Sequence, residues 1–297
     1  MRCRYPLFLK ANEGLPVPCG RCMPCRIKRR RLWTSRLLLE ALSHSDISFV
    51  TLTYANNPVT LIPRDSQLWL KRLRKRFIKK LRYYLVGEYG SISDRPHYHA
   101  ILFGFPSCLH GRPVVTSKSN CPCLPCSELQ SSWPHGFTYN GTFSRESAQY
   151  VCGYVNKRMT SKKDPRLQGR HPEFSRMSRR PGIGALAMEH VAKAISKAGK
   201  DYCLVDGDVP THVKMEGKSV LFGSYLRDKL RYHLDLPLGT PQANVDKYRG
   251  ECLDAIVDAY LGLPRFEALS EVFSSRYKGV CDNIEARYKI FNSGGPL

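Results

Sequence analysis

Two histidines separated by one residue lie in the segment 95–105, RPHYHAILFGF. The apolar alternation that follows predicts a strand, so His97 and His99 would point to the same face of a sheet. Glu88 lies in segment 82–90, which predicts the other strand of a hairpin, and it could provide a third ligand. Two imidazoles and one carboxylate, with positions left open, suit a divalent cation that also holds a phosphate oxygen.

The histidine pair alone does not decide the chemistry. An H-x-H pattern is common, and by itself it is more often structural than metal-binding. Asp94, in the turn before the pair, is a competing carboxylate, although turns often contain Asp for local hydrogen bonding.

Two tyrosines and a lysine supply a reaction for such a metal. Tyr150, Tyr154 and Lys157 lie in segment 144–158, where the pattern predicts a helix with Ser144 at its start and all three side chains on one face. A phenol has a pKa near 10 and is a poor nucleophile at neutral pH, so attack on a phosphodiester requires that the phosphate charge be screened. Tyrosines at this spacing are usually packing residues. Their combination with the histidine pair favours DNA strand cleavage through a phosphotyrosine ester.

The charge of the chain points to a polyanionic partner. Lys and Arg number 47 against 25 Asp and Glu, a net charge of +22, and neutralising phosphates releases condensed counterions. A solubilising surface is the plainer alternative. A membrane partner is not expected, because no apolar run approaches about 20 residues and no clean amphipathic basic helix stands out. The N-terminus lacks a secretory signal pattern.

Five basic side chains are candidates for DNA contact. Eight of the twelve residues 71–82 are Lys or Arg, on the polar face of a predicted helix, and two further arginines lie in a predicted polar loop. These candidates are Arg72, Arg76, Lys79, Arg179 and Arg180. Trp69, Tyr83 and Tyr84 could stack on exposed bases, or they could pack against the sheet.

The cysteines indicate metal sites, since twelve are many for a chain without an export signal. Cys3, Cys19, Cys22 and Cys25 could hold a structural Zn²⁺ that pins the N-terminus and the basic helix after it. Free buried thiols and an iron–sulfur cluster are the alternatives.

A second cysteine group lies in the loop-like region 106–136. Its members are Cys108, Cys121, Cys123 and Cys126, with His110 or His135 as alternative ligands. A metal here would stiffen a connection that is long for a structureless loop.

The predicted elements indicate an α+β fold in which helices pack on a central antiparallel sheet. We expect strands at 48–54, 82–90, 97–105 and 136–143, and helices at 26–44, 64–81 and 144–158. Leu70, Leu73, Phe77 and Leu81 would form the buried stripe of the second helix. Residues 160–184 predict a surface loop. Helices, including 251–262 and 265–277, and a short hairpin predict a mainly helical C-terminal extension.

Three segments resemble the motifs of rolling-circle replication initiators of the HUH endonuclease superfamily. They are FVTLTY, GEYG with RPHYHAILFG, and YVCGYVNKR. Within that superfamily the chain most resembles the two-tyrosine replication initiation proteins of gokushoviruses, single-stranded DNA phages of the microvirus group. PCGRCMPCRIKRRRLW and EFSRMSRRPGIG are similar to that family as well, so the resemblance covers about residues 1–185.

The resemblance implies a fold, a site and a reaction. The fold would be a split βαβ, ferredoxin-like arrangement. His97 and His99 would be the metal-binding pair with Glu88, and Tyr154 and Tyr150 the nucleophiles beside Lys157, with Tyr154 expected to act first because it fits the YxxK pattern. The reaction would be a Mg²⁺- or Mn²⁺-dependent, site- and strand-specific nick at a phage origin through a 5′-phosphotyrosine, followed by strand transfer and ligation.

The implied setting is the cytoplasm of an infected bacterium, with single-stranded origin DNA, and host helicase and polymerase, as partners. We expect a Cys-rich basic element at 1–46, the endonuclease core at 47–185 and a C-terminal extension at 186–297. An HUH transposase or relaxase, and a non-catalytic zinc-stabilised nucleic-acid-binding protein, are the alternative functions.

Overall fold

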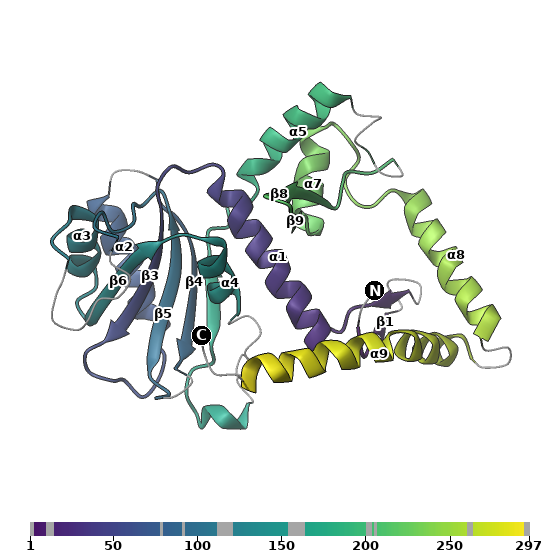
Figure 1. Cartoon of the computed structure of the whole chain (residues 1–297), viewed down its shortest axis with the longest axis horizontal. Helices are drawn as coiled ribbons and strands as arrows, with labels where there is room; N and C mark the ends of the chain where they lie inside the picture. The colour runs from purple at the N-terminus through teal and green to yellow at the C-terminus, as the bar shows by residue number, and fades with distance from the viewer. Residues whose placement is uncertain are drawn as a thin grey trace.

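A five-stranded antiparallel sheet forms the centre of the protein (Figure 1). The computed structural model describes residues 3–9, 15–77, 80–90, 93–111, 121–153, 164–199, 204, 207–259 and 264–293. The strand order is β6-β3-β5-β4-β7. The strands are β3 (Ile47–Tyr54), β4 (Arg82–Tyr89), β5 (Pro96–Phe103), β6 (Gly136–Thr142) and β7 (Phe174–Met177). The four predicted strands and the α+β class are therefore confirmed.

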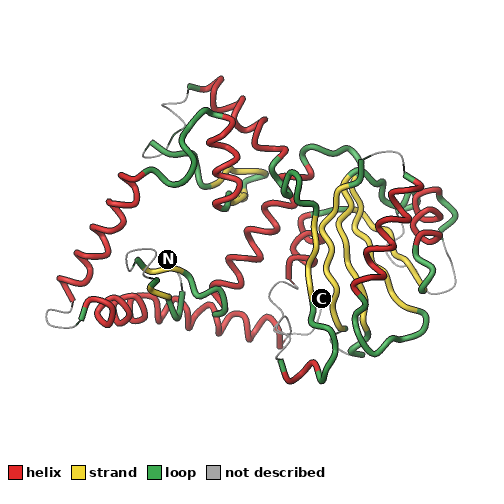
Figure 2. The backbone as a smooth tube through the Cα atoms, turned by 180° about the vertical axis from the view of Figure 1, so that it is seen from behind, coloured by secondary structure: helices red, strands yellow, loops and turns green. Residues whose placement is uncertain are grey.

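Helices cover both faces of this sheet (Figure 2). On one face, Tyr98, Ala100 and Leu102 of β5 join a core with α2 (Pro63–Arg76) and α3 (Leu124–Ser132). On the other face, Ile101 and Phe103 join a core with α1 (Met23–Ala41) and α4 (Arg145–Gly153). The predicted alternation along the histidine strand is confirmed, and His97 and His99 lie in the row that faces α4.

Three elements differ from their predictions. The helix predicted at 64–81 ends at Arg76, because Phe77 turns extended and packs its ring against Phe105 with the ring centroids 5.1 Å apart. Phe77 and Leu81 are thus buried outside the helix, although both belong to the predicted apolar core. The short helix α3 and the edge strand β7 lie in segments that were predicted as loops.

The C-terminal elements pack on the opposite side of α1 from the sheet (Figure 1). They are α5 (Leu186–Ala198), the β8 (His212–Met215) and β9 (Lys218–Leu221) hairpin, α7 (Ser224–His233), α8 (Gln242–Ala259) and α9 (Arg265–Ser293). A 3-10 turn spans Pro165–Leu167. The predicted helices and hairpin are confirmed. None of the helices in the described part of the chain is long and apolar enough to span a bilayer.

The N-terminal residues lie against the last helix. The two-residue strands β1 (Leu7–Phe8) and β2 (Pro16–Val17) pair with each other, and Phe8 packs into a small core that includes Phe273 of α9. Arg4 Nη1 donates to Asp282 at 2.6 Å and to Glu285 at 3.1 Å. The first and last described segments of the chain are thus joined directly.

A buried carboxylate connects α1 to the sheet. Glu40 is fully buried, and its oxygens accept hydrogen bonds from Arg82 of β4 and, at 2.6 Å, from the backbone N–H of Gly184. Burial raises the pKa of Glu40, but the hydrogen bonds from His44, Arg82 and Gly184 outweigh it and the pKa is lowered. The same side chain therefore holds three segments that are distant in sequence.

Replacing Glu40 with Ala should cost about 3–5 kcal/mol of the free energy of unfolding, because Arg82 would remain buried without its partner. Urea denaturation of the two proteins measures the difference. Since the folded pKa is lowered, the stabilisation is complete above the unfolded pKa of about 4.3 and is lost as pH falls through the folded value. Glu189→Ala removes an exposed helix pair and should cost at most about 0.5 kcal/mol; an equal loss in both variants would contradict the assignment.

Candidate metal and nucleophile site

The strand register brings the candidate ligands together. Glu88 of β4 lies directly opposite His97 of β5, and His99 lies opposite Thr51 of β3. Directly opposed residues of antiparallel strands project to the same face. One acidic, two imidazole and one hydroxyl side chain therefore meet on the α4 side of the sheet.

The ligand atoms of Glu88, His97 and His99 all lie within 4.8 Å of one another. One carboxylate oxygen, Glu88 Oε1, is 2.7 Å from His97 Nε2 and 3.2 Å from His99 Nε2. Glu88 and His99 are buried, and His97 is partly exposed. Three electron-rich atoms that converge at such distances require a proton or a cation between them, and this donor set suits a divalent metal with open coordination positions.

Neighbouring groups fix the orientation of both imidazoles. The Arg95 carbonyl can only accept, so His97 Nδ1–H donates to it at 3.0 Å and Nε2 is left facing Glu88. The Thr51 hydroxyl lies 2.9 Å from His99 Nδ1 and holds that ring in the same sense. Burial raises the pKa of Glu88, but hydrogen bonds from His97 and His99 outweigh it and lower the pKa to about 2. The carboxylate is therefore ionised at neutral pH.

Tyr150 lies over this cluster. Its hydroxyl is 3.5 Å from His99 Nε2, and its ring meets those of His99 and Phe49 nearly edge-on. The side chain is 48% exposed, so a substrate can reach it. Tyr150 is thus the predicted nucleophile that the described residues bring to the histidine pair.

Helix α4 is anchored at both ends. Ser144 Oγ accepts from Ser147 N–H at 3.1 Å and Ser147 Oγ accepts from Ser144 N–H at 2.8 Å, a reciprocal cap that confirms Ser144 at the helix start. Near the other end, Arg30 of α1 donates from Nε to the carbonyl of Gln149 at 3.1 Å. The orientation of Tyr150 therefore depends on the basic helix.

Several predicted residues fall elsewhere. Tyr154, Lys157 and Lys79 lie outside the described residues. Asp94 is not part of the cluster, since it pairs with Arg170 in the turn. Its competing role as a ligand is not supported.

The candidate DNA-contact residues have different surroundings. Arg72 Nε donates to the Ser132 carbonyl at 2.7 Å, and Arg76 contacts Glu128 and Ser131 of α3. Arg179 and Arg180 are exposed. Their roles in DNA binding stay predictions.

Two of the three proposed base-stacking aromatic residues are core residues instead. Trp69 and Tyr84 have no exposed surface, because Trp69 of α2 packs against the sheet and Tyr84 of β4 packs under α1. Only Tyr83 keeps an accessible edge.

The first cysteine group assembles as predicted. Sγ atoms of Cys3, Cys19, Cys22 and Cys25 lie within 4.8 Å of one another. The N–H groups of Arg21 and Cys22 donate to Cys19 Sγ, each at 3.4 Å. Burial raises the pKa of the Cys19 thiol, but these hydrogen bonds outweigh it and lower the pKa to about 7. Four thiols with such backbone donors can hold a tetrahedral metal such as zinc.

The second cysteine group assembles as well. Cys108, Cys121, Cys123 and Cys126 also lie within 4.8 Å of one another. His110 Nδ1 lies 3.0 Å from Cys121 Sγ, beside the four thiols. None of the cysteines in the described ranges forms a disulfide. This second tetrad fixes the segment that leads into α3.

Three residues near the site were missed from the sequence. Thr51, Phe49 and Arg30 contact the candidate ligands or the tyrosine helix, yet none has a side chain that by itself indicates catalysis. Thr51 lies in the strand motif FVTLTY, but its neighbour on β5 depends on a register that the sequence alone does not fix.

Residues 47–159 match a family model whose description is Replication-associated protein ORF2. The predicted family resemblance is confirmed. The chain is 30% identical over 194 residues to Replication-associated protein ORF2 of Spiroplasma virus 4, covering 61% of this chain and 59% of that protein. It is 29% identical over 166 residues to Replication-associated protein VP4 of Bdellovibrio phage phiMH2K, covering 52% of each chain.

A third relative extends the same pattern. Replication-associated protein ORF4 of Chlamydia phage 1 is 29% identical over 155 residues, which cover 49% of this chain and 39% of that protein. The chain thus spans 39% to 59% of the length of these relatives. No solved structure matches the chain.

If Glu88, His97 and His99 bind the cation, Thr51→Val should weaken Mn²⁺ affinity about 10–100-fold, because the hydrogen bond that orients His99 is lost. Calorimetric titration with Mn²⁺ measures the affinity. Thr53→Val is the matched control, since the Thr53 hydroxyl donates to the Phe137 carbonyl on the next strand. Equal affinities in the two variants would remove Thr51 from the site.

If each cysteine tetrad holds one zinc, the purified protein should contain two zinc ions per chain by elemental mass spectrometry. Cys22→Ser and Cys123→Ser should each leave one, because each removes a ligand of a different tetrad. Cys252→Ala, outside both tetrads, should leave two. A zinc-free protein with unchanged thermal stability would rule out a structural metal.

Proposed function

We propose that the chain is a rolling-circle replication initiator, which nicks one DNA strand at a phage origin through a tyrosine nucleophile. The observation that carries the proposal is the 3.5 Å approach of the Tyr150 hydroxyl to His99 Nε2, at the cluster of Glu88, His97 and His99. A cation bound there and a nucleophile beside it are the two components of metal-assisted phosphodiester cleavage. The similarity to phage replication-associated proteins supports the same assignment.

The reaction exchanges one phosphodiester for another. The Tyr150 oxygen forms a bond to phosphorus, the bond from phosphorus to O3′ breaks, and the phenolic proton is transferred to the leaving O3′. A divalent cation held by Glu88, His97 and His99 would supply charge screening for the scissile phosphate when bound. The products are a 5′-phosphotyrosine and a free 3′-hydroxyl that primes synthesis.

The reverse reaction would complete a replication round. Tyr154 is one helical turn beyond Tyr150 in the sequence, so it is the candidate for the second cleavage, with Lys157 as the nearby cation. The 3′-hydroxyl released by that cleavage would attack the first phosphotyrosine and close the displaced strand. Both tyrosines therefore belong to the proposal, and their order is set by experiment.

We expect a covalent protein–DNA adduct when the protein is incubated with single-stranded origin DNA and Mn²⁺, and none when a chelator is present. The Tyr150→Phe/Tyr154→Phe variant should form no adduct, because both nucleophilic oxygens are removed. Gel shift under denaturing conditions detects the adduct, and mass spectrometry of the nucleotide-bearing peptide identifies the tyrosine.

The control for this experiment is Tyr232→Phe, which alters an exposed tyrosine far from the sheet. It should form the adduct as the parent does. A folded parent protein that binds the DNA but forms no adduct would contradict the nickase and favour a non-catalytic nucleic-acid-binding protein. An adduct retained by the double variant would exclude the tyrosine mechanism.

A further inference from the structure

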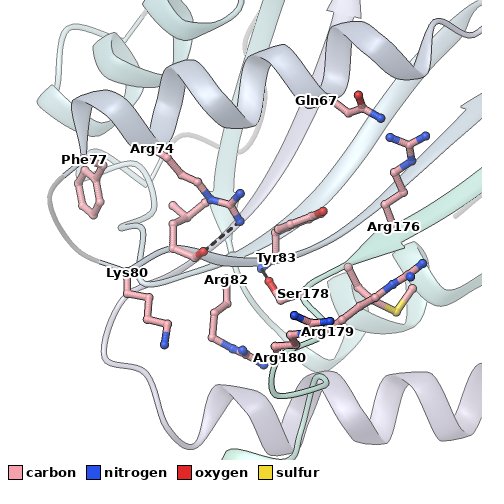
Figure 3. Close-up of a pocket in the computed structure, with 12 residues that line it drawn as sticks. Gln67, Arg74, Phe77, Lys80, Arg82, Tyr83, Arg176, Ser178, Arg179 and Arg180 are labelled. Carbon is pink, nitrogen blue, oxygen red and sulfur yellow. Dashed lines mark hydrogen bonds between the residues drawn. The ribbon is translucent and has the colours of Figure 1, made fainter.

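A cavity of about 1060 Å³ opens at the edge of the sheet remote from the histidine cluster (Figure 3). It lies where the end of α2 meets the start of β4 and the end of β7. Its polar wall carries six basic side chains, namely Arg74, Lys80, Arg82, Arg176, Arg179 and Arg180. No acidic residue contributes to its described lining.

The charge of this cavity is largely uncompensated. Arg82 is paired with Glu40 and is therefore neutralised. Among the residues that the structure describes, none of the other five forms an ion pair. Five like charges around one cavity repel each other unless an anion is present, so the cavity is suited to a ligand with several negative charges.

Aromatic groups lie within the same wall. Arg74 stands over the Tyr83 ring at 5.3 Å, and Phe77 lies beside it. The Tyr83 N–H donates to Ser178 Oγ at 3.1 Å, which joins β4 to the loop that carries Arg179 (Figure 3). Cationic side chains interleaved with accessible rings are the combination that binds phosphates and bases of a nucleic acid strand.

The position of the cavity separates it from the cleavage chemistry. Arg82 and Glu88 are at opposite ends of β4, six residues and about 20 Å apart at 3.4 Å per residue. Tyr83 and Leu85, which is paired with Arg176, also face the opposite side of the sheet from Glu88. A strand that reaches both places must extend about six stacked nucleotides, at 3.4 Å each, beyond the scissile phosphate.

We infer that this cavity is a second DNA-binding site, which holds the backbone of origin DNA outside the cleaved sequence. The inference rests on the proposed function for the identity of the DNA, but its binding contacts are independent of catalysis. The ligand is a polyphosphate backbone, with Tyr83 offering a surface for one base. Its role is to hold the flanking strand while the tyrosine site cuts.

The test is the salt dependence of binding, measured by fluorescence anisotropy with single-stranded DNA. The Lys80→Gln/Arg176→Gln/Arg179→Gln variant should reduce the slope of log affinity against log salt by about 2, because each single-strand phosphate contact contributes about 0.7. The matched control, Lys197→Gln/Lys214→Gln/Lys218→Gln, removes the same charge from α5 and the β8–β9 hairpin and should leave the slope unchanged.

The length of the DNA provides the second measurement. Oligonucleotides with fewer than about six nucleotides beyond the scissile phosphate should be bound equally by parent and variant, while longer ones should separate them. Equal slopes in the variant and the control would overturn the inference. So would an unchanged slope with lost binding to polyglutamate, which would identify an acidic protein as the occupant.

Failure of the inference is distinguishable from failure of the proposed function. A parent protein that forms no adduct but shows the expected slope difference would refute the nickase and leave the second DNA site intact. A parent that forms the adduct, with a variant whose slope equals that of the control, would do the reverse.

Discussion

The pairing register of β4 and β5 is the constraint on which the candidate site depends. It sets Glu88 opposite His97, and two residues further along it sets Val86 opposite His99. A slip of one residue would turn every side chain of a strand to the other face, so the histidines would enter the α2 core and Tyr98 would face α4. The large side chains of that core, with Tyr98 and Trp69 fully buried, therefore stabilise the metal ligands indirectly.

Helix α1 couples the other parts of the protein to this register. Its Glu40 binds Arg82 at the start of β4, its Arg30 contacts the end of the tyrosine helix, and its first turn follows the cysteine tetrad. Because α1 is a single rigid element, the nucleophile, the metal ligands and the N-terminal metal site share one support. The basic residues of α1 thus have a structural role as well as charge.

The sequence predicted the features that local patterns determine. Strand alternation placed His97 and His99 on one face, cysteine spacing placed both tetrads, and the helical pattern placed Tyr150 on the helix that covers the histidines. What it missed depends on contacts between distant segments. Phe77 leaves its helix to meet Phe105, β7 becomes a strand because the edge of β4 is available, and Trp69 is buried by the sheet below it. The partner of Thr51 is likewise a product of tertiary register.

The contacts of Arg4 with Asp282 and Glu285 also bear on how the protein is made. They join residues separated by 278 and 281 positions. A ribosome delivers the N-terminal cysteines first and α9 last, so the N-terminal element is exposed to solvent for nearly the whole time of synthesis. The sheet can form before α9 exists, whereas the cover over the N-terminal tetrad cannot. Completion of translation is therefore the event that closes this end of the molecule.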